Sequence, residues 1–281
     1  MLSDVHIEAL SSLPPLREVI SAHGLRAEKS LGQNFLLDQN LTDKIARQAV
    51  DLSGKTVIEI GPGPGGLTRS LLKTHAEKVV AIEFDPRAVE ALQGLKEAAQ
   101  GRLEILQLDA LQADLKTISE GPKVIIANLP YNIATTLLLG WLKDLRESSG
   151  CYDEMILMFQ KEVAMRICAD KGNKTYGRLS VISQWLCETK AVMELPPAAF
   201  TPPPKVKSSV VRFAPRPPES DAPAFDVVEQ LTQQAFGQRR KMIRSTLKPY
   251  QEHFEKLGLD PQSRAEELQV SDFIKLAKNL P

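Results

Sequence analysis

The residues best suited to do chemistry in this chain are Asn128, Leu129, Pro130 and Tyr131, which directly follow the apolar run 124–127. The Asn128 side-chain oxygen and the Leu129 carbonyl can each accept one N–H of an exocyclic amine. Pro130 lacks a backbone donor and fixes the main chain, and Tyr131 offers a ring for stacking. The set suits a planar base that carries an amine, although a proline also commonly ends a strand.

A second segment with chemical potential is 56–68, which reads TVIEIGPGPGGLT. It predicts a strand, a tight turn and the start of an amphipathic helix. Gly61, Gly63 and Gly66 have the G-x-G-x-x-G spacing of dinucleotide-binding proteins, so a dehydrogenase is one hypothesis. Glu83 ends the next apolar run, where a carboxylate can bind both hydroxyls of an adenosine ribose. Nucleotide enzymes and S-adenosylmethionine enzymes both need that contact.

The two cofactors differ because only the dinucleotide contains phosphates. A dinucleotide has a pyrophosphate that binds backbone N–H groups at a helix N-terminus, whereas S-adenosylmethionine presents an amino acid and a sulfonium. Pro62 and Pro64 remove donors from the turn, and Glu59 adds a negative charge on the same rim. These residues favour the sulfonium cofactor.

The elements that position these residues follow from the apolar periodicity. Strands are expected at 56–60, 78–83, 103–108, 123–127 and 154–159, with helices notably at 15–22, 87–95 and 135–145. This alternation predicts an α/β fold with a doubly wound, Rossmann-like parallel sheet that binds its ligand at the carboxyl ends of the strands. Glu83, Asp109 and Asn128 end the second, third and fourth strands, so we expect one ligand to bring them together.

The C-terminal part has a different pattern. A proline-rich stretch after residue 194 precedes a strand at 209–213, and residues 224–281 show helical spacing without a strand pattern. The predicted organisation is an N-terminal extension at 1–24, an S-adenosylmethionine-binding domain at 25–216 and a small all-helical domain at 217–281. A polar linker is expected at 25–31.

Composition limits the class of protein. The 281 residues are 43% hydrophobic, enough for one large core and a small second one. The three cysteines and four histidines are scattered, which predicts thiols in a reducing compartment and no metal site. No basic-then-apolar leader and no apolar stretch of membrane-spanning length is present. We therefore expect a cytoplasmic enzyme without a membrane partner.

The zero net charge hides an uneven distribution. Residues 155–216 carry ten Lys or Arg against four acids, and residues 236–250 carry five cations and no acid. Such segregation predicts a cationic face for a polyanion, although a solvated helix face has the same composition. Arg240, Arg244 and Lys248 are expected on one face of a helix, flanked by Arg239 and Lys241.

Six segments of the chain resemble, in the same order, the motifs of the ribosomal RNA adenine N6,N6-dimethyltransferases: 33–36 (QNFL), 59–65, 128–131, 176–180, 200–206 and 236–241. The resemblance covers about residues 25–275 and implies a class I methyltransferase fold and S-adenosylmethionine as methyl donor. Segment 200–206 and the long C-terminal region most resemble the bacterial small-subunit enzymes, which modify two adjacent adenosines in the hairpin near the 3′ end of 16S rRNA. The alternatives are an erythromycin-resistance type methylase of large-subunit rRNA and a ribosome-assembly factor with secondary catalysis.

The resemblance also implies roles for individual residues. Cofactor contacts are expected at Asn34, Leu36, Gly61, Gly63, Glu83, Asp109 and Asn128. The catalytic set would be Asn128, Leu129, Pro130 and Tyr131, with Phe200 as a second ring that sandwiches a flipped adenine against Tyr131. RNA contacts are expected at Lys205, Arg239, Arg240, Lys241, Arg244 and Lys248. The implied partner is 16S rRNA within the small subunit, bound by a monomer.

Overall fold

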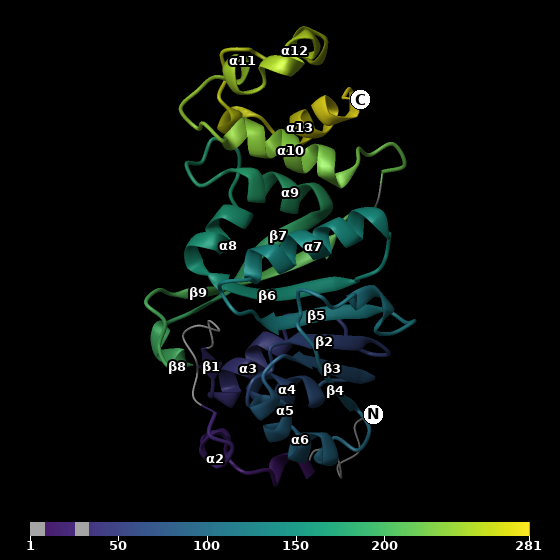
Figure 1. Cartoon of the computed structure of the whole chain (residues 1–281), viewed down its shortest axis with the longest axis vertical. Helices are drawn as coiled ribbons and strands as arrows, with labels where there is room; N and C mark the ends of the chain where they lie inside the picture. The colour runs from purple at the N-terminus through teal and green to yellow at the C-terminus, as the bar shows by residue number, and fades with distance from the viewer. Residues whose placement is uncertain (1–8, 26–33, 218, 281) are drawn as a thin grey trace. The chain divides into compact units, whose positions relative to one another are not determined.

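The computed structural model describes residues 9–25, 34–217 and 219–280 (Figure 1). Most of the predicted linker at 25–31 lies outside the described residues, and so does Gln33. Contacts divide the chain into a larger unit, with residues 1–140, 150–161 and 191–213, and a smaller unit, with residues 141–149, 162–190 and 214–281.

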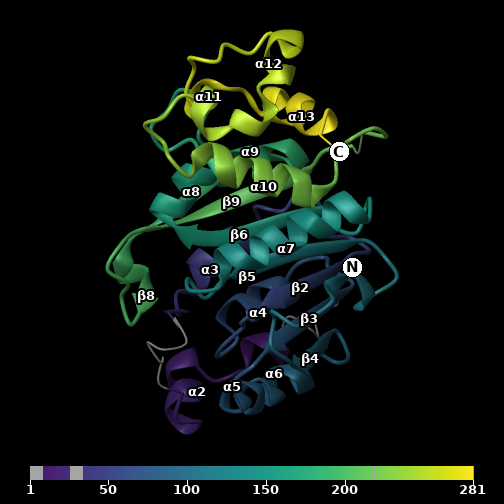
Figure 2. The ribbon, with the colours of Figure 1, turned by 45° about the horizontal axis from the view of Figure 1, so that its top comes forward.

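Seven strands form one sheet in the order β4-β3-β2-β5-β6-β9-β7 (Figure 1 and Figure 2). Their bounds are β2 Thr56–Ile60, β3 Lys78–Glu83, β4 Leu103–Gln107, β5 Lys123–Asn128, β6 Glu154–Gln160, β7 Cys187–Leu195 and β9 Ser208–Pro215. β2 to β6 pair in parallel, and β9 runs antiparallel to β6. The five predicted parallel strands are confirmed to within one residue at each end. The sequence did not predict β7, because all its residues between the two ends are exposed or half-buried and show no regular alternation.

The parallel strands read as continuous apolar runs because both faces of the sheet are covered. All five residues of β2 are buried, as are the first five of β5. The accompanying helices are α3 Gln39–Ala46, α4 Gly66–Leu72, α5 Pro86–Ala91, α6 Gln93–Ala98 and α7 Ala134–Glu147, with a 3₁₀ turn η2 at Leu115–Thr117. The helix predicted at 87–95 is two short helices that meet at Leu92. Within the described ranges, no helix combines the length and apolar character needed to cross a membrane.

The strand order creates a switch point beside β2. From β2 the chain builds β3 and β4 on one side, and it then returns to place β5 and β6 on the other side. The loops that leave β2 and β5 therefore diverge and leave a crevice at the carboxyl ends of these strands. This crevice is where the sequence predicts the ligand.

The described part of the N-terminal extension is docked on the larger unit. Helix α2, Leu16–Ala22, confirms the helix predicted at 15–22. Val19 and Leu25 pack with Ala88 and Ala91 of α5, and Leu10 joins the main apolar cluster. Residues 9–24 therefore contribute buried apolar surface and are not a loose tail.

A short two-stranded sheet lies beside the main one and was not predicted. β1, Phe35–Leu36, pairs antiparallel with β8, Phe200–Thr201, which follows a 3₁₀ turn η3 at Pro197–Ala199. The carbonyl of Leu36 rests against the start of α4, and a Cβ placed on Gly66 would overlap its oxygen. The third glycine of the G-x-G-x-x-G pattern is therefore required by this close packing and not by its φ angle.

The smaller unit is helical but is drawn from separate parts of the sequence. Its helices are α8 Lys161–Ile167, α9 Arg178–Leu186, α10 Phe225–Phe236, α11 Ile243–Thr246, α12 Glu252–Leu257 and α13 Val270–Lys278, with 3₁₀ turns η4 Lys248–Tyr250 and η5 Ala265–Glu267. Val181 of α9 is buried in one apolar cluster with Leu231 and Phe273. The helical domain placed at 217–281 from the sequence therefore also includes 141–149 and 162–190.

The prediction that Arg240, Arg244 and Lys248 lie on one face of a single helix is wrong. α10 ends at Phe236, α11 has four residues, and Lys248 begins a separate 3₁₀ turn that contains Pro249. The backbone N–H groups of Ile243 and Arg244 donate to the carbonyls of Ser263 and Pro261, so this segment is tied to a loop instead of extending α10.

We expect Gly66→Ala to lower the free energy of unfolding by about 1–3 kcal/mol, because the new methyl group must displace the Leu36 carbonyl. Gly94→Ala is the matched control, since Gly94 is also helical but a Cβ placed there would have no other atom within 4 Å. That control should be neutral or stabilising by up to about 1 kcal/mol. Urea unfolding of both variants measures the difference, and equal effects would contradict the packing argument.

Candidate functional site

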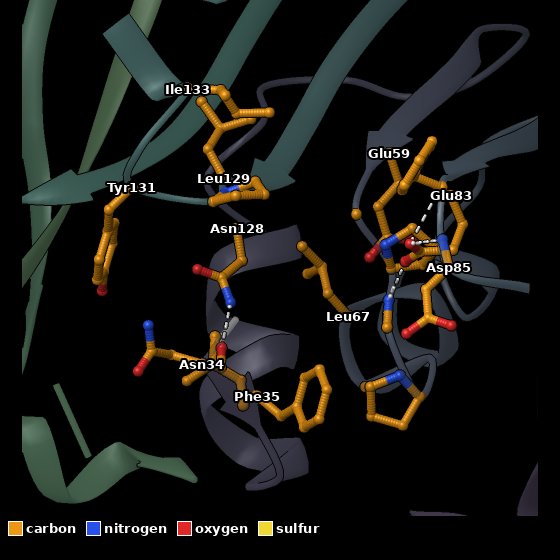
Figure 3. A pocket seen from close by; sticks show the side chains of 18 of the residues that line it. Asn34, Phe35, Glu59, Leu67, Glu83, Asp85, Asn128, Leu129, Tyr131 and Ile133 are labelled. Carbon is orange, nitrogen blue, oxygen red and sulfur yellow. Dashed lines mark hydrogen bonds between the residues drawn. The ribbon is translucent and has the colours of Figure 1, made fainter. Parts of the chain in front are cut away.

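A cavity lies at the carboxyl ends of β2, β3 and β5, in the predicted crevice (Figure 3). It brings together all seven predicted cofactor residues: Asn34, Leu36, Gly61, Gly63, Glu83, Asp109 and Asn128. Leu129, Pro130 and Tyr131 line the same cavity. Residues from five separate stretches of sequence thus meet at one site, as the sheet topology requires.

The cavity has two chemically different ends. Figure 3 shows Glu59, Glu83 and Asp85 grouped on one side and the Tyr131 ring on the other, with Asn128 between them. Acids at one end and an amide with an aromatic ring at the other are suited to two different ligand parts.

Glu83 is both a site residue and a structural one. One carboxylate oxygen accepts the backbone N–H groups of Phe84 and Asp85 at 2.8 and 2.9 Å, and the other accepts that of Gly63 at 3.1 Å. Burial raises the pKa of Glu83, and these three hydrogen bonds oppose the rise. The carboxylate therefore ties the glycine turn to the end of β3.

The glycine turn at 61–65 has no free backbone donor. The Gly61 N–H donates to the Ile82 carbonyl, that of Gly65 to the Pro62 carbonyl, and that of Gly63 to Glu83. Positions 62 and 64 are prolines, which have no N–H. A pyrophosphate would find no donor in this turn, so the geometry argues against the dinucleotide hypothesis.

Glu59 is the most strongly perturbed acid of the site. Glu59 is only 2% exposed. Its carboxyl atom Oε2 has no hydrogen-bond partner within the part of the chain that the structure describes. Burial raises the pKa of Glu59 to about 8, the Thr68 hydroxyl opposes this rise, and the negative charge of Glu83 adds to it. Burial therefore disfavours the negative charge predicted on this rim, and a cationic group bound nearby would favour it again. A buried carboxyl oxygen of this kind fits a ligand that carries an ammonium, whose N–H groups can donate to it.

Sequence reasoning missed two apolar residues of the site. Phe84 and Leu111 line the cavity and are 63% and 49% exposed. Exposed large apolar side chains in a cavity commonly pack on a ligand. The available signal was a phenylalanine directly after the strand-ending Glu83, where a loop residue is usually polar.

At the other end, the groups near Asn128 are neutral. The Asn128 amide nitrogen donates to the Asn34 carbonyl at 3.0 Å, and the Tyr131 hydroxyl bonds the Ser208 hydroxyl at 2.6 Å. Burial raises the pKa of Tyr131, so its phenol stays protonated. No local pattern indicated the Ser208 contact, because it joins residues 77 positions apart.

The structure does not bring Phe200 to the cavity. Its side chain is 3% exposed and belongs to the main apolar cluster with Leu36 and Val210. Its backbone pairs with Leu36 in the small sheet. The predicted sandwich of a base between Tyr131 and Phe200 is therefore not formed in this conformation.

The predicted RNA contacts lie outside the cavity on exposed surface. Lys205 is exposed in the larger unit, and Arg240, Lys241, Arg244 and Lys248 are exposed in the smaller one. Arg239 has a structural role in addition, since it donates to the carbonyls of Lys174 and Tyr176 and pairs with Glu266.

Comparison with protein families matches residues 24–281 to the family described as ribosomal RNA adenine dimethylase. The chain belongs to this family. This chain is 51% identical over 269 residues to "Ribosomal RNA small subunit methyltransferase A" of Rhodospirillum rubrum. The match covers 95% of this chain and 92% of that protein.

Two solved structures resemble the structure of this chain. A dimethyladenosine transferase from Plasmodium falciparum has a TM-score of 0.68 and 26% identity, covering 85% of this chain and 94% of that one. The 23S rRNA methyltransferase ErmE has a TM-score of 0.66 and 23% identity, covering 87% of this chain and 98% of that one, a likeness in fold. The predicted class I methyltransferase fold with a helical C-terminal region is confirmed.

Membership of this family makes the protein an enzyme that uses S-adenosylmethionine to methylate adenine in ribosomal RNA. The cavity fits this cofactor, because the glycine turn has no free donor for a pyrophosphate and the orphaned Glu59 oxygen can accept from a cationic group. The described residues contain no group of three or more His, Cys, Asp or Glu side chains placed to bind a metal ion.

The raised pKa of Glu59 predicts a stability effect with a defined sign. The native carboxyl keeps its proton up to about pH 8, whereas the unfolded one loses it near its ordinary pKa of 4.5, so the native state binds more protons between these values. Stability from this group therefore falls as pH rises through that window. Glu59→Gln removes the penalty, and we expect it to stabilise the cofactor-free protein by roughly 1–3 kcal/mol more at pH 8 than at pH 5. Urea unfolding at both pH values measures this, and an equal effect at both would contradict the assignment.

Proposed function

We propose that this dimethylase transfers methyl groups to N6 of two adjacent adenosines in the hairpin near the 3′ end of 16S rRNA, within the small ribosomal subunit. The observation that carries the proposal is one cavity with acids at one end and Asn128 to Tyr131 at the other. The small-subunit assignment is supported by relatives about half identical over nearly the whole chain, such as that of Rhodospirillum rubrum, which is named as a small-subunit methyltransferase.

The acidic end is proposed to hold the cofactor. Glu83 would accept from the ribose hydroxyls, Asp109 from the adenine amine, and Glu59 from the ammonium of the methionine part. Phe84 and Leu111 would pack on the adenine faces. Bound S-adenosylmethionine supplies an electrophilic methyl group, and these residues fix where it is presented.

The other end is proposed to orient the target amine. Adenine N6 is a poor nucleophile because its lone pair is delocalised into the ring. The Asn128 side-chain oxygen and the Leu129 carbonyl would each accept one N–H, which favours a pyramidal nitrogen with its lone pair free to attack. The product ammonium is acidic enough to lose its proton to water, so no strong general base is needed. The neutral Tyr131 phenol agrees with this, since it is a weak base.

The target base must leave its helix to reach this end, because pairing hides N6. The Tyr131 ring lines the cavity and would stack on the flipped adenine, a contact worth roughly 1–3 kcal/mol. Phe200 as the second ring stays a prediction, and it requires that β8 moves out of the apolar cluster. Since two methyl groups are added, the pocket must also accept the monomethylated product.

Binding to the particle is proposed to depend on the exposed cations Lys205, Arg239, Arg240, Lys241, Arg244 and Lys248, with the protein acting as a monomer. Phosphate contacts of this kind give affinity that is independent of base sequence, so they would hold the particle while the cavity selects the adenosine.

The function is tested by incubating the protein with labelled S-adenosylmethionine and either undermethylated small subunits or isolated large subunits. We expect two methyl groups on each of two adjacent adenosines in the 3′ hairpin of small-subunit RNA. Label found only in large-subunit RNA would instead support the erythromycin-resistance type of methylase, and binding without label would support an assembly factor.

Asn128→Ala should leave folding and particle binding intact but lower the single-turnover rate of methyl transfer by about 10²-fold, because one acceptor for the target amine is lost. Tyr131→Ala should mainly weaken capture of the base, whereas Tyr131→Phe keeps the ring and should retain most activity. A wild-type rate for Asn128→Ala at saturating cofactor would show that the amide does not act on the amine.

Replacing Arg240, Arg244 and Lys248 together by Gln should weaken particle binding and flatten its salt dependence by roughly 0.7–0.9 log units per lost phosphate contact. Cofactor affinity and melting temperature should stay unchanged, because all three side chains are exposed. Arg17, Lys44 and Lys96 are also exposed, and their replacement by Gln is a control of equal charge loss. An identical salt slope in the two triple variants would argue against an RNA-binding role.

A further inference from the structure

The Asn128 side chain has one hydrogen bond that its proposed role does not use. Its Nδ2 donates to the main-chain carbonyl of Asn34 at 3.0 Å, across 94 residues of sequence (Figure 3). A main-chain carbonyl can only accept, so the nitrogen of the amide must face Asn34. The oxygen of the same amide then faces the opposite way, on the side where Figure 3 shows the Tyr131 ring.

This orientation has a chemical consequence, because the two ends of an amide are not equivalent. If the side chain were rotated by half a turn, its NH2 group would meet the NH2 group of adenine, and neither could accept. The hydrogen bond to Asn34 removes that choice before the base arrives. Preorganisation of this kind avoids a reorganisation cost during the reaction.

The Asn34 carbonyl is itself held firmly, because the 34–36 segment is fixed on three sides. The Phe35 ring lies 2.9 Å from a Cβ placed on Gly63, and the Leu36 carbonyl rests on Gly66. Phe35 and Leu36 also pair with Thr201 and Phe200 in the small sheet. The segment therefore contacts the glycine turn of the cofactor site and, through Asn34, the amide of the base site.

We propose that the 34–36 segment is a positioning element for catalysis, in which the Asn34 main-chain carbonyl fixes the Asn128 amide with its oxygen toward the target amine. Asn34 acts here through its backbone and touches neither the adenine nor the methyl group in this role. The inference rests on the proposed function of Asn128 as an acceptor for N6. It adds that the donor half of the same amide is needed as well.

Asn128→Asp separates the two halves of the amide. A carboxylate keeps an acceptor for the target amine but cannot donate to the Asn34 carbonyl. We expect its single-turnover rate at saturating cofactor and particle to fall by about 10²-fold, as for Asn128→Ala, with little change in KM for the particle or in calorimetric affinity for S-adenosylhomocysteine. If Asn128 serves only as an acceptor, Asn128→Asp should match the wild-type rate or exceed it, because a carboxylate accepts hydrogen bonds more strongly than an amide. That result would overturn the proposal.

A measurement without catalysis tests the hydrogen bond directly. In protein labelled with ¹⁵N and ¹³C only at asparagine, a coupling across the hydrogen bond should connect the Asn128 side-chain nitrogen to the Asn34 carbonyl carbon, with and without S-adenosylhomocysteine. The signal should vanish in Asn128→Asp. Absence of the coupling, with side-chain amide protons that exchange as fast as those of an exposed asparagine, would overturn the inference whatever the rates are.

The variants also separate this inference from the proposed function. A wild-type rate for Asn128→Ala would remove the role of Asn128 altogether. A slow Asn128→Ala beside an active Asn128→Asp would keep the acceptor role and overturn only the positioning by Asn34.

Discussion

The site depends on one carboxylate at the end of a buried strand. Glu83 uses both oxygens to accept backbone N–H groups, two from the chain that follows β3 and one from the glycine turn after β2. This contact joins the glycine turn after β2 to the chain that follows β3, which together form one side of the crevice. It also occupies the Gly63 donor, which a phosphate would otherwise take. The same interaction thus shapes the cavity and makes the glycine turn less suited to a phosphate.

The two ends of the cavity differ in charge. The acids are gathered at the end proposed to bind the cationic cofactor, and burial there raises the pKa of Glu59. The end proposed to receive a neutral amine contains an amide and a protonated phenol. Orientation rather than charge is what a weak, neutral nucleophile requires. The cations that would attract RNA lie on the surface, where they do not compete for the buried acids.

The sequence predicted what is encoded locally. Continuous apolar runs located the five parallel strands, and the polar residue at each strand end located the cavity, because parallel strands present their carboxyl ends at one edge. Contacts between distant segments left no local pattern. The pairing of β1 with β8, the bond from Tyr131 to Ser208 and the burial of Phe200 each depend on chain that is far away in sequence. The basic segment 239–248 was predicted to be one helix from its spacing alone. In the structure, the backbone N–H groups of Ile243 and Arg244 instead donate to carbonyls of loop 261–263.

The interleaved composition of the smaller unit has a consequence for synthesis of the chain. Tyr176 and Val181 are buried in one apolar cluster with residues of α10 and α13, which begin at Phe225 and Val270. A nascent chain that has emerged as far as α9 therefore carries an unmatched apolar face until α10 and α13 have also emerged. The residues of the larger unit all lie at or before Phe213. Translation thus favours an order in which the larger unit can form before α10 and α13 of the smaller unit have been made.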